Sequence, residues 1–130
     1  MKKPRIKIKV NKEDTGYSAY TRMGVNLIAT QGETFEELKK NILDAVNLAF
    51  ENQSFVYSID EIQFEFDLES FFDFYKVINA KALSERIGMN QSLLSQYIKG
   101  TKKPSASQTK RILNGVQQIG RELTEVQFLL

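Results

Sequence analysis

One polar segment in the second half of the chain combines side chains that can read DNA bases. The polar residues of this segment lie at helical spacing, so they share one face of a helix. Its polar residues are Asn90, Gln91, Ser92, Ser95, Gln96 and Lys99. Glutamine can form a bidentate contact with adenine, and serine can bond to several base edges in the major groove. The pattern therefore predicts a face that binds double-stranded DNA.

The residues that follow this segment suit the DNA backbone. Thr101, Lys102 and Lys103 come directly after the polar face, where they can contact phosphates. A single glutamine on a helix surface is ordinarily only solvated. The competing interpretation is therefore a helical hairpin whose polar face contacts solvent and binds no DNA. The DNA-binding hypothesis therefore depends on the elements that position these residues.

Capping signals predict two short helices joined by a tight turn. Asn79 can cap a helix over 80–87, and Gly88 can end it in the left-handed conformation. Asn90 can cap the next helix, over 91–99, before Gly100 ends it. Two short helices joined by three residues are typical of a helix-turn-helix.

Apolar residues at matching positions predict how these helices pack. Leu83 and Ile87 on the first helix can face Leu94 on the second, with Met89 filling the gap. Pro104 and Ser105 predict the start of a further helix. Its expected buried stripe is Ile112, Val116, Ile119 and Leu123.

The stretch from Asn79 to Ser105 resembles the helix-turn-helix of Xre/Cro-type repressors. The matching positions are Leu83, Ile87-Gly88-Met89, Asn90-Gln91-Ser92, Ser95, Tyr97, Gly100 and Pro104-Ser105. The sequence departs from the family at Ser84, where alanine is preferred, and at Ile98, where a charged residue is common. The resemblance implies a dimer that binds a pseudo-palindromic operator, with one half-site for each recognition helix.

Alternating patterns in the first half predict a sheet with one covering helix. The expected strands are 6–10, 17–23, 25–30 and 62–68, and the first three should form an antiparallel meander. Thr34 and Glu37 form a capping-box pattern at the start of a helix over 34–51. We therefore expect an α+β chain, with a β-β-β-α-β domain over 1–68 and a helical domain over 69–130.

The stretch from Gly16 to Ala45 resembles the N-terminal domain of HicB-type antitoxins. It carries Gly16-Tyr17-Ser18-Ala19, and then Ala29-Thr30-Gln31-Gly32-Glu33-Thr34-Phe35-Glu36-Glu37. The family's Pro-x-Leu-Pro-Gly segment is missing, and 22–25 stands there instead. The resemblance implies a partial ribonuclease-H-like fold and a small basic ribonuclease toxin of the HicA type as partner. We place the toxin-facing surface on Tyr17, Tyr20 and Arg22.

Charge is distributed unevenly between the two halves. Residues 1–68 contain 9 basic and 11 acidic side chains, a net charge of −2, whereas 69–130 contain 9 and 5, a net charge of +4. The first half is thus compatible with a basic partner and the second with phosphates. Apolar residues at Ile98, Val126, Phe128 and Leu130 are candidates for a homodimer surface.

Composition narrows the chemistry further. The chain has no cysteine and no histidine, which excludes disulfides, thiolate metal sites and imidazole catalysis. We expect no cofactor and no bound metal. Since no apolar run reaches the length of a membrane span and the N-terminus lacks a signal-peptide pattern, we also expect a cytoplasmic protein without a membrane partner.

Two alternatives remain. A nuclease of the ribonuclease-H type needs clustered carboxylates that hold two Mg²⁺ ions, whereas the first strand carries only basic charges. Glu61, Glu65 and Asp67 share one face of the fourth strand, and a solvated face explains them more simply. We therefore expect no enzymatic activity. The other alternative is a solitary transcription regulator whose first domain binds a ligand or another protein.

Overall fold

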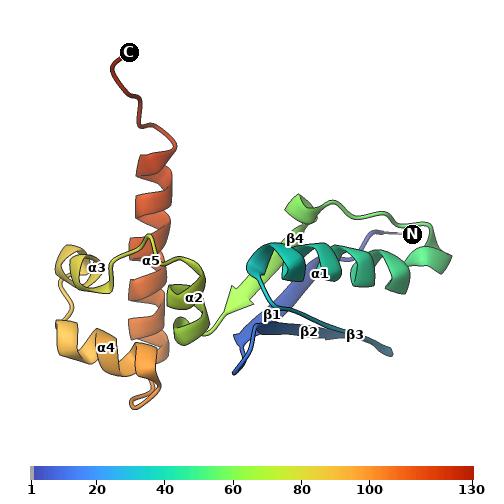
Figure 1. Cartoon of the computed structure of the whole chain (residues 1–130), viewed down its shortest axis with the longest axis horizontal. Coiled ribbons are helices and arrows are strands. Elements are labelled where there is room, and N and C mark those ends of the chain that lie inside the picture. Colours follow the sequence, from blue (N-terminus) through green and yellow to red (C-terminus); the bar gives the residue numbers. More distant parts are fainter. Residues whose placement is uncertain (1) are drawn as a thin grey trace. The chain divides into compact units, whose positions relative to one another are not determined.

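The computed structural model describes residues 2–130, which form an α+β chain with a four-stranded mixed sheet and five α-helices (Figure 1). The chain divides into two compact units, of which the first ends at Phe74 and the second is Tyr75–Leu130. None of the helices among residues 2–130 combines the length and apolar character that a membrane crossing requires.

The sheet of unit 1 has the strand order β3-β2-β1-β4. Its strands are β1 (Ile6–Lys12), β2 (Tyr17–Met23), β3 (Asn26–Gly32) and β4 (Ile62–Phe66). The predicted antiparallel meander of the first three strands is confirmed, and β4 joins it parallel to β1. Strict alternation in β1 buries one side of the strand and exposes the basic side. The sheet therefore has one covered face and one open face.

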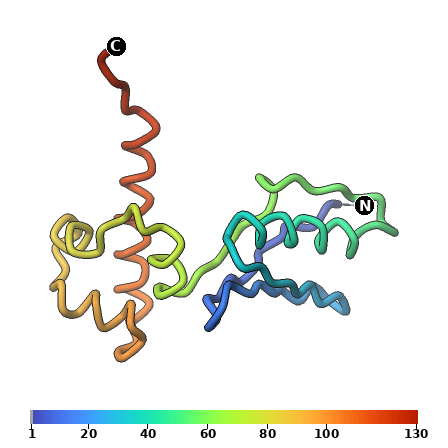
Figure 2. Tube along the Cα trace, in the orientation of Figure 1, coloured from blue at the N-terminus to red at the C-terminus, as the bar shows by residue number. Residues whose placement is uncertain are grey.

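Helix α1 (Phe35–Ala49) covers one face of the sheet, with Leu38, Ile42 and Val46 fully buried (Figure 1). The Thr34 hydroxyl caps its first turn by accepting from the Glu37 amide at 3.1 Å. The chain then passes through two short 3₁₀ turns, Glu51–Gln53 and Ile59–Glu61, before it returns to β4 (Figure 2).

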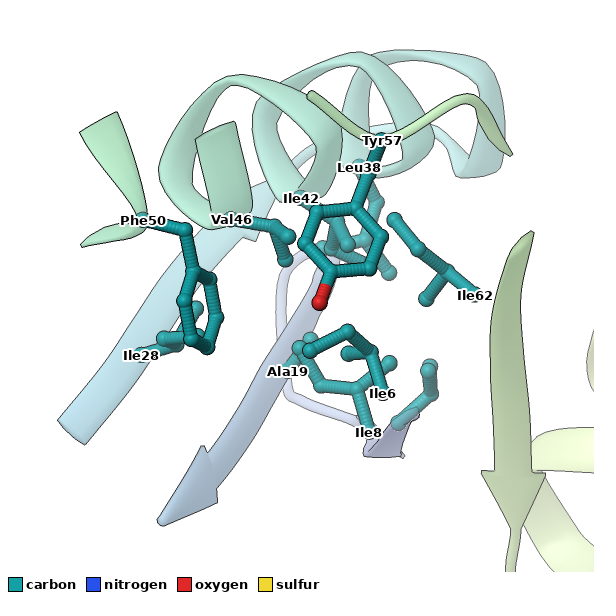
Figure 3. Packing of buried hydrophobic residues seen from close by; sticks show 11 residues of the cluster. Ile6, Ile8, Ala19, Ile28, Leu38, Ile42, Val46, Phe50, Tyr57 and Ile62 are labelled. Atoms are coloured by element: carbon teal, nitrogen blue, oxygen red, sulfur yellow. The ribbon is translucent and has the colours of Figure 1, made fainter. Parts of the chain in front are cut away.

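Aromatic and aliphatic side chains from these elements close one core. Phe50 and Tyr57 from the connection pack with Ile28 and Ile8 of the sheet and with α1 (Figure 3). The buried Tyr57 hydroxyl donates to the Pro4 carbonyl at 2.6 Å, so its polar end is satisfied.

Helix α2 (Leu68–Phe74) belongs to unit 1, so the boundary expected between 68 and 69 is wrong. The buried Ser70 hydroxyl accepts from the Lys12 amide at 2.8 Å, and Asp73 accepts from the Tyr17 hydroxyl. Phe74 lies 4.2 Å from the Tyr17 ring, centroid to centroid. These contacts attach α2 to the β1–β2 hairpin. They join residues more than 50 positions apart, so the local sequence pattern could not predict them.

Unit 2 contains α3 (Ala80–Ile87), α4 (Gln91–Lys99) and α5 (Ala106–Leu123), and the predicted bounds of α3 and α4 are confirmed. Each of the three helices begins at a residue whose side chain caps it. The core of unit 2 consists of the buried residues Leu83, Ser84, Met89, Leu94, Tyr97 and Ile112. The Ser84 hydroxyl donates to the Lys81 carbonyl at 2.6 Å, which explains how serine is accommodated at this buried position.

The expected buried stripe of α5 is only partly confirmed. Ile112 is buried and Val116 and Ile119 are half-buried, but Leu123 is 64 % exposed. The end of α5 extends beyond α3 and α4 (Figure 1), and the side chain of Leu123 there is left largely exposed.

Candidate nucleic-acid interface

Helix α4 divides into a buried side and an exposed polar side. Leu94 and Tyr97 anchor it in the core of unit 2 and are 1 % and 8 % exposed. Since these residues lie three apart, the opposite side of the helix is left to solvent. The exposed members of the predicted site are Asn90, Gln91, Ser92, Gln96, Lys99, Thr101, Lys102 and Lys103. Ser95 is half-buried.

The two glutamines on this face keep their side-chain hydrogen-bonding groups available. Gln91 lies in the first turn of α4 and Gln96 in its second half, and both are exposed. No hydrogen bond among residues 2–130 occupies either carboxamide, although both could donate and accept. This pair can therefore form new contacts without breaking old ones.

Asn90 has a structural function at the start of α4. Its side-chain oxygen accepts from the Leu93 amide at 3.1 Å, which fixes the first turn. Gly88, with φ of 69°, ends α3 in the left-handed conformation just before this cap. The cap therefore uses one acceptor position of the Asn90 oxygen, whereas no hydrogen bond among residues 2–130 involves its NH₂ group.

Two backbone hydrogen bonds to one carbonyl oxygen hold the loop after α4. The amides of Thr101 and Lys102 both donate to the Gln96 carbonyl, at 3.1 and 3.3 Å. Gly100 provides the required left-handed turn, with φ of 79°. Lys102 and Lys103 consequently lie close to the C-terminal end of the polar face and are fully available to an anion.

Arg111 supports the turn between α3 and α4 and was missed by sequence reasoning. Its guanidinium donates to the carbonyls of Ile87 and Gly88 at 2.9 and 2.7 Å. A cation at a helix C-terminus is a known stabilising partner, but Arg111 lies 23 residues from Gly88 along the chain. Nothing local in the sequence links the two positions.

The two units differ strongly in charge once the observed boundary is used. Unit 2 contains nine basic and three acidic residues, a net charge of +6, and unit 1 contains nine basic and thirteen acidic residues, a net charge of −4. Within unit 2, Arg86 forms an ion pair with Glu122 and thereby lowers the pKa of that carboxyl. The remaining positive charge is therefore mostly uncompensated by neighbouring acids.

The residues expected to face a toxin do not share one surface. Tyr20 and Arg22 are exposed on the open face of the sheet. Tyr17 instead lies on the face that α1 covers, in contact with the core and bonded to Asp73. That hydrogen bond, together with burial, raises the pKa of Tyr17 to about 12. The placement of Tyr17 on an exposed partner surface is wrong, because strand alternation sets odd-numbered β2 positions inward.

The candidate dimer residues differ in exposure. Ile98 is half-buried on α4, whereas Val126, Phe128 and Leu130 follow α5 and are 51, 86 and 122 % exposed. The three terminal residues form no strand within the chain. They are thus available to another molecule.

The acidic residues near β4 are held by local contacts. Glu61 binds Lys3 at 2.8 Å and also accepts from the Ser58 amide, and both contacts lower the pKa of Glu61. Asp67 accepts from the Ser70 amide at 2.7 Å and so caps α2. Among residues 2–130, no three acidic side chains are grouped as a metal site would require.

No family model, curated protein or solved structure matches this chain.

Proposed function

We propose that this protein is a DNA-binding transcription regulator that reads duplex DNA with α4. The observation that carries the proposal is the exposed polar side of α4, where the carboxamides of Gln91 and Gln96 are unoccupied. In such an arrangement the second helix enters the major groove, and the first turn of the helix contacts base edges.

Backbone contacts would fix the register of this helix on the duplex. Lys102 and Lys103 extend from a loop that the Gln96 carbonyl holds in place. The net charge of +6 on unit 2 favours association with a polyanion and increases the rate of encounter. Base reading and backbone positioning would therefore come from adjacent parts of one unit.

We infer that the regulator acts as a homodimer through the end of α5. Leu123, the last residue of α5, and Val126, just beyond it, are 64 and 51 % exposed, although they are large and apolar. A second copy would remove this surface from water. The resulting twofold symmetry would match a pseudo-palindromic operator.

The proposal extends to an antitoxin that neutralises a small basic ribonuclease toxin through unit 1. The net charge of −4 on unit 1 favours a basic partner. However, Tyr20 and Arg22 share the open sheet face with Lys7 and Lys9, and this basic surface would repel a basic toxin. This observation favours the second candidate, a solitary regulator whose first unit binds something else.

Two experiments test these proposals. Selection of duplexes from a random pool would yield a preferred site, and Gln91→Ala or Gln96→Ala should weaken binding to it. A chain that enriches no site would contradict the regulator proposal.

Co-purification from the native operon, followed by mass spectrometry, tests the antitoxin proposal. Recovery of a small basic partner supports the antitoxin, and a chain recovered alone favours the solitary regulator.

A further inference from the structure

The open face of the sheet in unit 1 carries positive charge, although the net charge of unit 1 is negative. Lys7 and Lys9 of β1 and Arg22 of β2 all lie on this face and are exposed. Its only carboxylate within the strands is Glu65 of β4. Three of the four charged residues within the strands on this face are thus basic, and Glu13, just after β1, accepts a hydrogen bond from Ser18 of the face at 2.6 Å. The whole unit has a net charge of −4.

These cations are neighbours on the sheet, and Glu65 of β4 is the register partner of one of them, Lys9. Lys9 lies opposite Tyr20 in the β1–β2 register, Lys7 is two residues before Lys9 on the same side of β1, and Arg22 is two residues after Tyr20 on the same side of β2. Among the described residues, no ion pair involves any of the three cations. Three exposed cations without an ion pair on one face suit an anionic ligand.

The other side chains on this face favour phosphate over a protein as the anion. Lysine is depleted at protein–protein interfaces, whereas lysine, arginine, serine, asparagine, glutamine and tyrosine commonly contact nucleic-acid backbones. The polar residues that share the face are Asn11, Ser18, Gln31 and Gln63. Tyr20, 47 % exposed, lies next to the cations and offers a ring on which a base can stack.

The dimensions of the face favour a single strand over a duplex. Four strands at about 4.8 Å spacing make a surface roughly 14 Å across. The major groove of B-DNA is about 12 Å wide, so this surface is too broad to enter it. A single strand can instead lie across the sheet, with its phosphates on the cations and its bases turned toward the sheet.

We propose that the open sheet face of unit 1 binds single-stranded nucleic acid. Lys7, Lys9 and Arg22 bind successive phosphates, and Tyr20 stacks on one base. This activity is separate from duplex reading by α4, since it uses another surface in the other unit.

The test measures binding of a fluorescent oligouridylate to the full chain by anisotropy, at several salt concentrations. Excess unlabelled duplex DNA is present to occupy unit 2. Lys7→Gln and Lys9→Gln should each weaken binding and flatten the salt dependence by about 0.7. Tyr20→Ala should weaken binding at least about fivefold, whereas Tyr20→Phe keeps the ring and the affinity.

Lys40→Gln is the matched control, because it removes the same charge from the exposed side of α1 in the same unit. It should leave binding unchanged. Circular dichroism would establish that every variant is folded. The proposal is overturned if the chain binds no oligouridylate, or if Lys7→Gln, Lys9→Gln and Tyr20→Ala all bind as the parent does. Capture of a poly-glutamate peptide in place of the oligonucleotide would also overturn it, in favour of an acidic protein partner. Duplex binding by α4 is measured separately, so either activity can fail without the other.

Discussion

At the scale of single residues, Gln91 and Gln96 carry the proposed sequence reading. Both carboxamides are exposed and without partners in unit 2. We expect Gln91→Ala or Gln96→Ala to cost about 1–3 kcal/mol of binding free energy and to relax the preference at one base pair. Isotherms on duplexes with single base changes would measure both effects. An unaltered base-preference profile in both variants would remove these residues from the interface.

Lys102 has a different role, because phosphates carry no base identity. Lys102→Ala should lower affinity evenly across duplex sequences and reduce the slope of log affinity against log salt by about 0.9. The salt series on matched and mismatched duplexes measures this. A loss confined to one base pair would instead show that Lys102 reads sequence.

Tyr17 provides a pH-dependent test within unit 1. Its hydrogen bond to Asp73 raises its pKa to about 12, above the ordinary value near 10, so the folded protein retains a proton that the unfolded chain releases. The stabilisation is therefore complete below about pH 10 and is lost as pH rises toward 12. Tyr17→Phe should flatten the fall in free energy of unfolding over this window, measured by urea titration. An identical pH profile in the variant would contradict this assignment.

Residue-level prediction succeeded where a local rule applied. Asn90 was predicted as a cap, and its bond to the Leu93 amide confirms this. Tyr17 was grouped with Tyr20 and Arg22, although strand alternation sets it on the other face, and its partners Asp73 and Phe74 come from α2, which is distant in sequence. Arg111 was missed for the same reason, since it bonds to the turn before α4 only after folding.

At the scale of elements, the close approach of α3 and α5 depends on Gly115. A Cβ added there would lie 2.4 Å from Cγ2 of Ile87, a stiff β-branched side chain. Gly115→Ala should therefore lower the free energy of unfolding by about 1–3 kcal/mol, despite the better helix propensity of alanine. Gly120→Ala is the matched control, since nothing lies within 4 Å of its Cβ position, and it should be stabilising. Thermal unfolding distinguishes the two, and equal behaviour would contradict the contact.

Helices and strands with strong periodicity or caps could be predicted from the sequence. The predicted bounds of α3 and α4 coincide with the observed ones, because a cap and a left-handed glycine delimit each helix. The end of α2 and its membership of unit 1 could not be predicted, since the aromatic run continues through Tyr75. Long-range contacts with β1 and β2 decide that boundary.

At the scale of the whole molecule, the end of α5 is expected to join two copies. Leu123→Glu places a charge on an apolar surface that the chain itself leaves uncovered, so it should shift a dimer toward monomer. Sedimentation equilibrium measures the shift. Leu48→Glu, at a 72 % exposed position on α1, is the control and should leave the assembly intact. A monomeric parent chain, or a dimer unaffected by Leu123→Glu, would contradict this interface.

The measurement closest to the central claim compares Ser92→Glu with Ser107→Glu. Each serine is the second residue of its helix, α4 or α5, and each is exposed. A carboxylate in the first turn is favourable to a helix, so both variants should stay folded. If the polar side of α4 enters the DNA groove, Ser92→Glu should lower affinity for the selected duplex at least about tenfold by repelling phosphates, and Ser107→Glu should change it little. Equal affinity in the two variants would contradict duplex reading by α4.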